Sequence, residues 1–353
     1  MGIFSKLFGR KPQITNVHML TPPSNFTPWG GGAWESDIFR AAVDAIVRNA
    51  AKLKGVHAVN AHGLRRDGDA VLNRLLNTRW NPYMSAYDAL YRLFTQLFLY
   101  NNSFAFLSRS PNGDIDGIFP LHPAGVEFMT DSRGVLFVKF LLHDGKSYTL
   151  PYADVIHLRR HFNANDLLGD NNAALSPALE LAHAQNEGII QGIKTGAHLR
   201  GILRFAQIMS PDNLKTEKEA FINDYFKMDN SGGVVATDAK MEYSPLEMKP
   251  YPVDKELVQA ARQKIYSYLD VSAAIVEADY TEAQWNAFYE SVIEPLAVQV
   301  SLEFTAKVFT DRERAFGNEI LFESNRLQHA SMATKVKAIK ELMPMGLLTE
   351  NEA

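Results

Sequence analysis

A long helical segment with a proline in its middle constrains this chain more than any other feature. Thr281 can cap the segment, and Gln284 three residues later completes a capping box. Pro295 removes a backbone donor and clashes with the carbonyl four residues earlier. We therefore predict a long helix over residues 281–310 that is kinked at the proline. Its apolar face recurs for about six turns: Trp285, Phe288, Val292, Leu296, Val300 and Phe304.

A second helix is predicted over residues 253–270. The cations Lys255, Arg262 and Lys264 lie outside its apolar face. A solvated surface is the default interpretation of such cations. If many copies of the chain surrounded one axis, these residues would instead form a ring of charge that faces a polyanion. The apolar face itself has a residue at every fourth position: Leu257, Ala261, Ile265 and Leu269.

The break between these two helices covers residues 271–280. It contains two acidic residues, Glu277 and Asp279, followed by Tyr280, and it has little helical pattern. The sequence therefore predicts a loop here, between a shorter and a longer helix.

Composition places the chain among globular proteins. It has 353 residues, of which 46% are hydrophobic and 22% are charged, so we expect two or three domains. The formal net charge of −4 argues against a protein that coats nucleic acid through bulk positive charge, and it leaves a narrow contact open. The absence of cysteine excludes disulfides and thiolate metal sites.

The start of the chain, residues 1–33, is predicted to be an N-terminal arm. Met1–Lys11 is short, basic and amphipathic, and it lacks the apolar run and cleavage site of a signal peptide. Lys6 stands where a myristoylation motif has Ser or Thr. No stretch approaches the roughly 20 apolar residues that span a bilayer, so no membrane partner is expected. The alternative to a docking or mobile arm is a helix on a membrane surface.

Residues 34–175 mix helices with strands. Helices are predicted over 34–55, 69–77 and 86–100, the last of them capped by Ser85. Short strands then follow one another without intervening helices, so we expect one antiparallel meander and an α+β fold. These predicted strands are 104–108, 115–121, 126–130, 135–142, 147–150 and 155–159.

The next region is predicted to be a small α/β module between two helices. Ser176-Pro177 opens a helix through about residue 200, with Gly188, Gly192 and Gly196 along one strip. Such a strip indicates close helix packing. Within the module, residues 201–252, we predict strands 202–205 and 234–236 and a helix 211–227. After the long helix we predict a charged turn 311–314, a strand 320–323 and a final helix 331–342.

Two groups of side chains could carry metal chemistry. His157 and His161 are four residues apart, but His157 lies in a predicted strand and the glutamate of zinc-hydrolase helices is absent. We therefore interpret His157 as a packed or hydrogen-bonded strand histidine and predict no metal. Asp154, Asp166 and Asp170 lie near one another, and paired carboxylates can hold magnesium. Aspartates also serve turns, so a metal-dependent phosphodiesterase remains an alternative.

The sequence lacks the common motifs of nucleotide enzymes and hydrolases. There is no Gly-x-x-x-x-Gly-Lys-Ser/Thr loop, no Gly-x-Gly-x-x-Gly after a strand and no Gly-x-Ser-x-Gly turn. We therefore expect no catalytic residues and no cofactor.

Motifs along most of the chain resemble one protein family. The closest single match is Asp154-Val155-Ile156-His157-Leu158-Arg159. In their order and spacing, the motifs together resemble the portal proteins of tailed double-stranded DNA phages, in the large family typical of long-tailed phages. The family's Gly-x-Ser-Pro is stretched here to Gly169…Ser176-Pro177, and the Val-Pro before Tyr280 is missing. The other matching stretches are Ala41–Ile46, Leu75-Leu76 with Trp80–Pro82, Tyr100–Phe104, Phe119–Pro123 with Val126, and Gly346 with Thr349, Asn351 and Glu352.

The resemblance implies a homo-oligomeric ring, usually a dodecamer, at one capsid vertex of the virion, assembled in the host cytoplasm. Double-stranded DNA would pass through the ring during packaging and ejection. Implied partners are the terminase large subunit, the major capsid and scaffold proteins, and a head–tail adaptor. Channel residues are expected at the positions already noted: Lys255, Arg262, Lys264, Glu277, Asp279 and Tyr280.

The resemblance also implies a division of the chain into parts. These are a wing of residues 34–175 and 281–310, stem helices 176–200 and 253–270, a clip 201–252, a tunnel loop 271–280 and a crown 311–353. Relatives often continue past the last motif, so the crown is expected to be shortened. A smaller head–tail adaptor ring is the second alternative, against which the chain length and the long helix argue.

Overall fold

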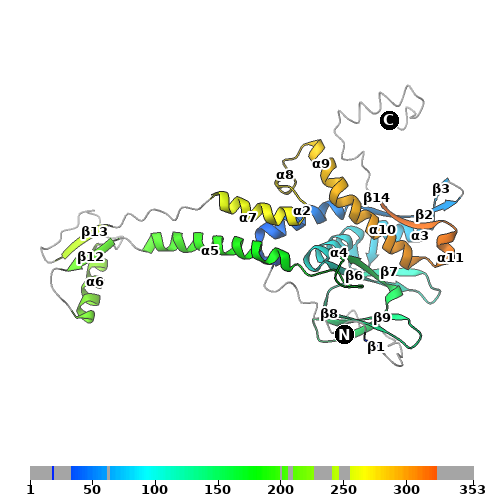
Figure 1. Cartoon of the computed structure of the whole chain (residues 1–353), viewed down its shortest axis with the longest axis horizontal. Coiled ribbons are helices and arrows are strands. Elements are labelled where there is room, and N and C mark those ends of the chain that lie inside the picture. The colour runs from blue at the N-terminus through cyan, green and yellow to red at the C-terminus, as the bar shows by residue number, and fades with distance from the viewer. Residues whose placement is uncertain are drawn as a thin grey trace, which may run out of the picture. The chain divides into compact units, whose positions relative to one another are not determined.

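The computed structural model describes residues 18–19, 33–61, 64–198, 201–205, 210–225, 241–245 and 255–323. The chain separates into two units (Figure 1): unit 1 comprises residues 1–179 and 261–353, and unit 2 comprises residues 180–260. The N-terminal arm apart from β1 (His18–Met19), the strand expected at 234–236 and the final helix expected at 331–342 lie outside the described residues.

The first helices of unit 1 form as their capping residues predict. Ser36 caps α2 (Asp37–Ala50), which follows the short helix η1 (Ala33–Glu35). Asp69 caps α3 (Ala70–Asn77), and Ser85 forms a capping box with Asp88 at the start of α4 (Ala86–Tyr100). The apolar faces of the two longer helices are fully buried, at Phe39, Val43 and Ile46 of α2 and Leu90, Leu93, Phe94 and Leu97 of α4.

The helix predicted over residues 34–55 is too long. It ends at Ala50, and Lys54–Ala61 form strand β2 instead. β2 is the central strand of the sheet β14-β2-β3, between β3 (Leu64–Asp67) and β14 (Asn318–Glu323). The strand forms because β14 supplies backbone partners from the far end of the chain, which local periodicity does not reveal.

The meander predicted over residues 104–159 is divided between two sheets. All its strand pairs are antiparallel, as expected. However, the last strand returns to pair with the first, at Val155 opposite Phe106, so one sheet is β11-β6-β7 and the other is β1-β8-β9-β10. Phe104, Phe128 and Phe140 belong to their shared buried core. The strands are β6 (Asn102–Arg109), β7 (Ile115–Leu121), β8 (Pro123–Thr130), β9 (Leu136–Leu142), β10 (Ser147–Pro151) and β11 (Val155–Arg159).

Trp80 joins the helices to the sheet of β14. It lies in β4 (Arg79–Asn81), which pairs with β5 (Met84–Ser85), and its side chain is fully buried. Its ring centroid lies 5.4 Å from that of Phe304 and 6.5 Å from that of Phe322. Its Nε1 donates to the Leu76 carbonyl oxygen at 3.2 Å, so the buried indole is satisfied.

The long helix is continuous but irregular. Thr281 and Gln284 form the predicted capping box of α9 (Glu282–Phe288). A π-helical turn, η4 (Tyr289–Ile293), follows, and α10 (Glu294–Val308) carries Pro295 in its first turn. The Glu294 N–H donates to the Tyr289 carbonyl, one residue farther back than in an α-helix. The irregularity predicted at the proline is therefore a widened turn just before it, which relieves the steric clash of the proline ring.

The remaining described elements are shorter. In unit 1 they are α8 (Ala273–Val276), α11 (Asp311–Ala315), η2 (Tyr152–Asp154) and η3 (Ala173–Leu175). Unit 2 contains β12 (Gly201–Phe205), which pairs antiparallel with β13 (Met241–Pro245), and α6 (Pro211–Tyr225). α5 (Ser176–His198) leads into unit 2, and α7 (Lys255–Tyr268) leads out of it.

Candidate functional site

The segment between α7 and α9 is held by two successive left-handed turns. At the first, Asp270 has φ = 57°. The Val271 N–H donates to the Tyr266 carbonyl at 3.0 Å, and the Asp270 N–H donates to the Ser267 carbonyl at 3.3 Å. These two bonds define a Schellman motif, which usually has glycine at the left-handed position.

The second turn repeats this arrangement with Ala278 at φ = 59°. The Asp279 N–H donates to the Ala274 carbonyl at 2.9 Å, and the Ala278 N–H donates to the Ile275 carbonyl at 3.4 Å. The prediction that residues 271–280 form a loop without helix is therefore wrong in one respect, because α8 forms a helical turn inside the segment. Buried Ile275 anchors that turn to unit 1.

The second turn presents the three predicted residues of the segment at the surface. Glu277, Asp279 and Tyr280 are all exposed. The Tyr280 ring stacks on Trp285, with centroids 5.3 Å apart and planes inclined by 28°. Among the described residues, neither carboxylate forms an ion pair within 4.0 Å. The turn is therefore an exposed acidic segment whose conformation is held by backbone hydrogen bonds and by the stacking of Tyr280 on Trp285.

The three predicted cations are all on helix α7. Lys255 is the first residue of α7. Arg262 and Lys264 are exposed farther along the same helix. At 3.6 residues per turn, positions two apart face directions roughly 200° apart, so Arg262 and Lys264 do not form one basic stripe. The structure therefore brings together the acidic part of the predicted set and places Arg262 and Lys264 on different faces of α7.

His157 is a buried, hydrogen-bonded strand residue, as the sequence predicts. Its Nδ1 lies 3.1 Å from the Tyr152 hydroxyl, and its Nε2 lies 3.2 Å from Asn102 Oδ1. That oxygen also accepts the Gly169 N–H, so it is an acceptor and His157 Nε2 carries the proton. The ring stacks on Phe104 at 4.3 Å. Burial lowers the pKa of His157 well below its ordinary value, so the ring is neutral.

A partly buried ion pair on α10 completes the surroundings of His157. Glu303 accepts the His157 N–H at 3.1 Å, and Lys307 lies 4.0 Å from the Glu303 carboxylate. Lys307 also donates to the Tyr152 carbonyl at 2.8 Å and lies over the Tyr152 ring. Burial raises the pKa of Glu303, lowers that of Lys307 and raises that of Tyr152 to about 12. This network ties α10 to β11 and η2, and its i, i+4 spacing is the sequence signal that could have revealed it.

Two of the three aspartates of the phosphodiesterase alternative have structural partners. Asp154 pairs with Arg109, with Nε and Oδ1 2.9 Å apart. Asp170 accepts the Ala164 N–H at 3.1 Å. Over the described ranges, no cluster of three or more His, Asp or Glu side chains could hold a metal. In the same ranges, no helix has the length and apolar character needed to cross a membrane.

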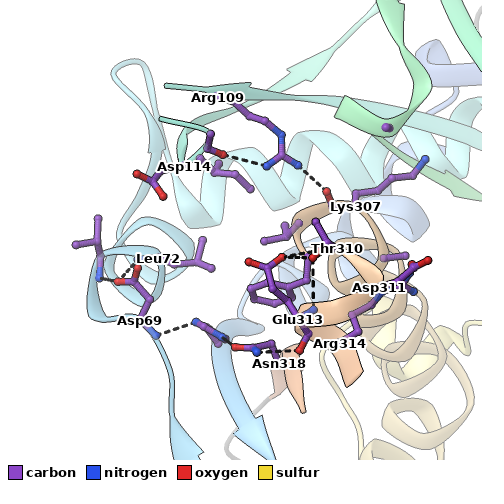
Figure 2. A pocket seen from close by; sticks show the side chains of 18 of the residues that line it. Asp69, Leu72, Arg109, Asp114, Lys307, Thr310, Asp311, Glu313, Arg314 and Asn318 are labelled. Atoms are coloured by element: carbon purple, nitrogen blue, oxygen red, sulfur yellow. Dashed lines mark hydrogen bonds and ion pairs between the residues drawn. The ribbon is translucent and has the colours of Figure 1, made fainter. Parts of the chain in front are cut away.

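A large cleft lies in unit 1 between α3, the β6–β7 hairpin and the end of α10 (Figure 2). Its volume is about 1090 Å³, and sequence reasoning did not anticipate it. His57 forms part of its floor: Nδ1 accepts the Asp69 N–H at 2.8 Å, and Nε2 lies 3.0 Å from Asn318 Oδ1. His57 therefore connects the cap of α3 to the start of β14.

The charged groups of this cleft mostly fix its own walls. Arg109 donates to the Gly113 and Lys307 carbonyls at 3.2 and 2.7 Å, which joins the hairpin to α10. Glu313 accepts the Thr310 N–H at 2.8 Å in the capping box of α11, whose N-cap is Thr310, and Arg314 pairs with Asp311 (Figure 2). Those backbone and hydroxyl bonds lower the pKa of Glu313. Arg109, Glu313 and Arg314 are thus already engaged, and their bonds mainly hold the walls of the cleft together.

Comparison with known proteins identifies the family. The phage portal protein family matches residues 37–353. The chain belongs to this family. Portal proteins are structural components of the phage head and not enzymes, which agrees with the absence of catalytic motifs. Among curated proteins, none matches the sequence.

Solved structures show the same fold at low sequence identity. A chain from the neck of an empty gene transfer agent particle has a TM-score of 0.68 and 15% identity, with 93% of each chain covered. A chain from the native neck, computed with C12 symmetry, has a TM-score of 0.65 and 15% identity, covering 90% of this chain and 89% of that one. A HK97-family phage portal protein from Corynebacterium diphtheriae has a TM-score of 0.53 and 15% identity, covering 85% and 96%. The α+β portal fold is thereby established for this chain.

Proposed function

We propose that this chain forms a ring at one capsid vertex and serves as the conduit for double-stranded DNA during packaging and ejection. The family match over residues 37–353 carries the proposal. The similar neck structure computed with C12 symmetry supports a dodecamer. In this arrangement the ring is part of the virion, and it is assembled in the host cytoplasm.

The parts of the chain would divide the work. Residues 34–175 and 281–310 form the wing, helices 176–200 and 253–270 the stem, and 201–252 the clip. The clip would meet the terminase large subunit and later a head–tail adaptor. The wing would meet the major capsid and scaffold proteins, and the crown, 311–353, would include β14, the strand that pairs with β2.

The channel must hold DNA weakly. Each phosphate contact adds affinity and salt dependence, so a strongly basic channel would stall translocation. A small number of cations, Lys255, Arg262 and Lys264, and an acidic turn at Glu277 and Asp279 meet that requirement. Segment 271–280 would be the tunnel loop that lies nearest the DNA. ATP hydrolysis would belong to the terminase.

Negative-stain electron microscopy of the purified chain tests the conduit. End-on averages should show rings with a central hole wide enough for a DNA duplex, and they would give the copy number. A uniform monomer across a wide concentration range would contradict the proposal. Magnesium-dependent cleavage of DNA by the purified chain would instead favour the phosphodiesterase alternative.

A further inference from the structure

The exposed residues of α10 are all apolar. There are four of them, Pro295, Val298, Leu302 and Ala306, and we call them the α10 stripe. Val298 is 52% exposed and Leu302 is 67% exposed. A helix at a protein surface normally has polar or charged residues on the side that faces water, so the stripe is a surface that needs a cover.

The stripe lies on the side of α10 away from the core of unit 1. Leu302 is two positions from each of the buried residues Val300 and Phe304. Two positions on a helix differ in direction by roughly 200°, so Leu302 faces the opposite way. On one flank of the stripe, Gln299 Nε2 donates to the Arg159 carbonyl at 2.7 Å, which places β11 on that side.

The end of β14 brings the following residues of the chain to the other flank. The Ile320 N–H donates to Thr305 Oγ1 at 2.8 Å, and the Phe322 N–H donates to Ser301 Oγ at 2.8 Å. The strand therefore runs toward the N-terminal end of α10. It ends at Glu323, one residue beyond the contact with Ser301. Because Ser301 is adjacent to Leu302, chain continuity places the next residues beside the middle of the stripe.

The segment after β14 has the length and the sequence pattern to cover the stripe. The final helix predicted over residues 331–342 lies outside the described residues; it would be roughly 18 Å long, and the stripe spans roughly 16 Å. Residues 324–330 can bridge up to roughly 23 Å, so the helix can reach either end of the stripe. Its residues Met332, Val336 and Ile339 follow the i, i+4, i+7 spacing and therefore share one apolar face.

Charge favours the same occupant. The predicted helix carries three lysines, Lys335, Lys337 and Lys340, and a single glutamate. Two acidic residues, Glu290 and Glu294, precede the stripe on the long helix. Attraction between these groups adds modestly to the burial of the apolar faces.

We propose that residues 331–342 form a helix that lies on the α10 stripe of the same chain, with Met332, Val336 and Ile339 against Val298 and Leu302. The contact joins the C-terminal part of the chain to α10. It belongs to one subunit and does not depend on the proposed ring, so both tests below use the purified chain in any oligomeric state.

A disulfide tests the placement directly, because the chain has no native cysteine. Leu302→Cys is combined in turn with Met332→Cys, Val336→Cys and Ile339→Cys, so that any register or direction of the helix is sampled. At least one pair should form a disulfide within one chain upon mild oxidation. Leu302→Cys with Thr334→Cys is the matched control, because Thr334 is two positions from Val336 and faces away from the stripe. It should react at least about tenfold more slowly.

Two outcomes of this test would overturn the proposal. One is a control pair that reacts as fast as all three test pairs, or test pairs that do not react. The other is a disulfide-linked dimer that persists on dilution before oxidation, since the segment would then lie on a second copy of the chain.

Limited proteolysis measures how firmly the segment is held. Trypsin cleaves after lysine, so cleavage at Lys335, Lys337 and Lys340 requires the docked helix to open, and its rate follows the population of the open form. Leu302→Gln should raise this rate at least about tenfold, because it removes an apolar side chain from the contact. Leu64→Gln in β3, at a position that is 62% exposed, is the control and should leave the rate unchanged.

The outcomes separate this proposal from the proposed function. Equal cleavage of wild type and Leu302→Gln overturns the docked helix. Unchanged cleavage together with loss of rings in Leu302→Gln also overturns it, because the stripe would then contact a neighbouring copy. Wild-type protein that forms no ring, with the expected disulfide and protection, overturns the proposed function alone.

Discussion

The two halves of α10 differ in how completely the charged groups around them are paired. Beside the C-terminal half, Glu303, Lys307 and His157 satisfy one another within the chain. Beside the N-terminal half, the buried Nη1 of Arg160 has no hydrogen-bond partner among the described residues. α10 therefore borders one group of charged side chains that is paired within the chain and one buried nitrogen that is not.

This difference in pairing indicates which residues stabilise the folded subunit and which residues serve its function. A network that is complete in one chain stabilises that chain and needs nothing else. A buried cation without a partner costs free energy, and so does a left-handed alanine, unless assembly compensates. We therefore expect changes near His157 to affect the stability of the subunit and changes near Ala278 to affect assembly and DNA passage.

The largest effect is expected when the charge of the acidic turn is reversed. Glu277→Lys with Asp279→Lys should reduce packaged, nuclease-protected DNA by at least about tenfold, because added phosphate contacts would slow translocation. Rings should be counted by microscopy first, so that lost assembly is separated from lost translocation. Normal packaging would remove the assignment of this turn to the channel. Asp114→Lys with Asp116→Lys, at the β6–β7 hairpin, provides a control with the same charge change.

Removing the buried imidazole should destabilise the subunit. His157→Leu removes the partner of the Tyr152 hydroxyl, one of the two donors to Asn102 Oδ1 and a ring stacked on Phe104, which should cost about 3 kcal/mol of unfolding free energy. Urea unfolding followed by tryptophan fluorescence measures this, since all four tryptophans belong to unit 1. His183→Leu, whose side chain is 76% exposed, should change the value by less than about 0.5 kcal/mol. Equal losses in both variants would refute the role of the network.

Acidification should act through the same residue. The pKa of folded His157 lies well below 6.5, so below that pH the unfolded chain binds a proton that the folded chain does not. The unfolding free energy should fall by up to about 1.4 kcal/mol per pH unit. His157→Phe cannot titrate, so the difference between wild type and this variant should shrink from about pH 7.5 to about pH 5.

Comparing wild type with His157→Phe also cancels the contribution of Glu303 to the pH dependence of the unfolding free energy, which has the opposite sign. Burial raises the pKa of Glu303, so the folded carboxyl takes up its proton earlier than the unfolded one and gains stability as the pH falls. A pH-independent difference between wild type and His157→Phe would mean that the buried histidine does not control acid stability.

The smallest effect concerns the left-handed turn. Ala278→Gly should raise the unfolding free energy by about 1 kcal/mol, since glycine adopts this conformation without strain. Ala274→Gly, inside α8, should lower it by about 0.5–1 kcal/mol. Changes of the same sign in both variants would contradict the strain assigned to Ala278.

Sequence patterns predicted the parts of the fold that depend on near neighbours. Ser85 and Thr281 fixed helix starts because a cap and its partner lie within one turn. Pro295 indicated an irregular helix because its missing donor acts locally. β2 was missed because Ala51 and Leu53 continue the apolar pattern of α2 and the strand exists only through β14.

In the candidate site, too, only the features that depend on near neighbours could be predicted from the sequence. Charges at Glu277 and Asp279 in a break between helices marked an exposed segment. Nothing in the residue type of Ala278 indicated a left-handed turn, which alanine disfavours. The isolation of Arg160 was also invisible, because it results from the positions of Phe98 and α10 rather than from neighbours in the chain.

The pairing of β2 with β14 has a consequence for the order of biosynthesis. β2 leaves the ribosome early, and its partner begins at Asn318. At about 5–20 residues per second, the central strand of this sheet waits on the order of tens of seconds with an open edge. Each subunit therefore completes its fold only after nearly all of the chain has been translated, and until then the nascent chain depends on avoiding strand addition by other polypeptides.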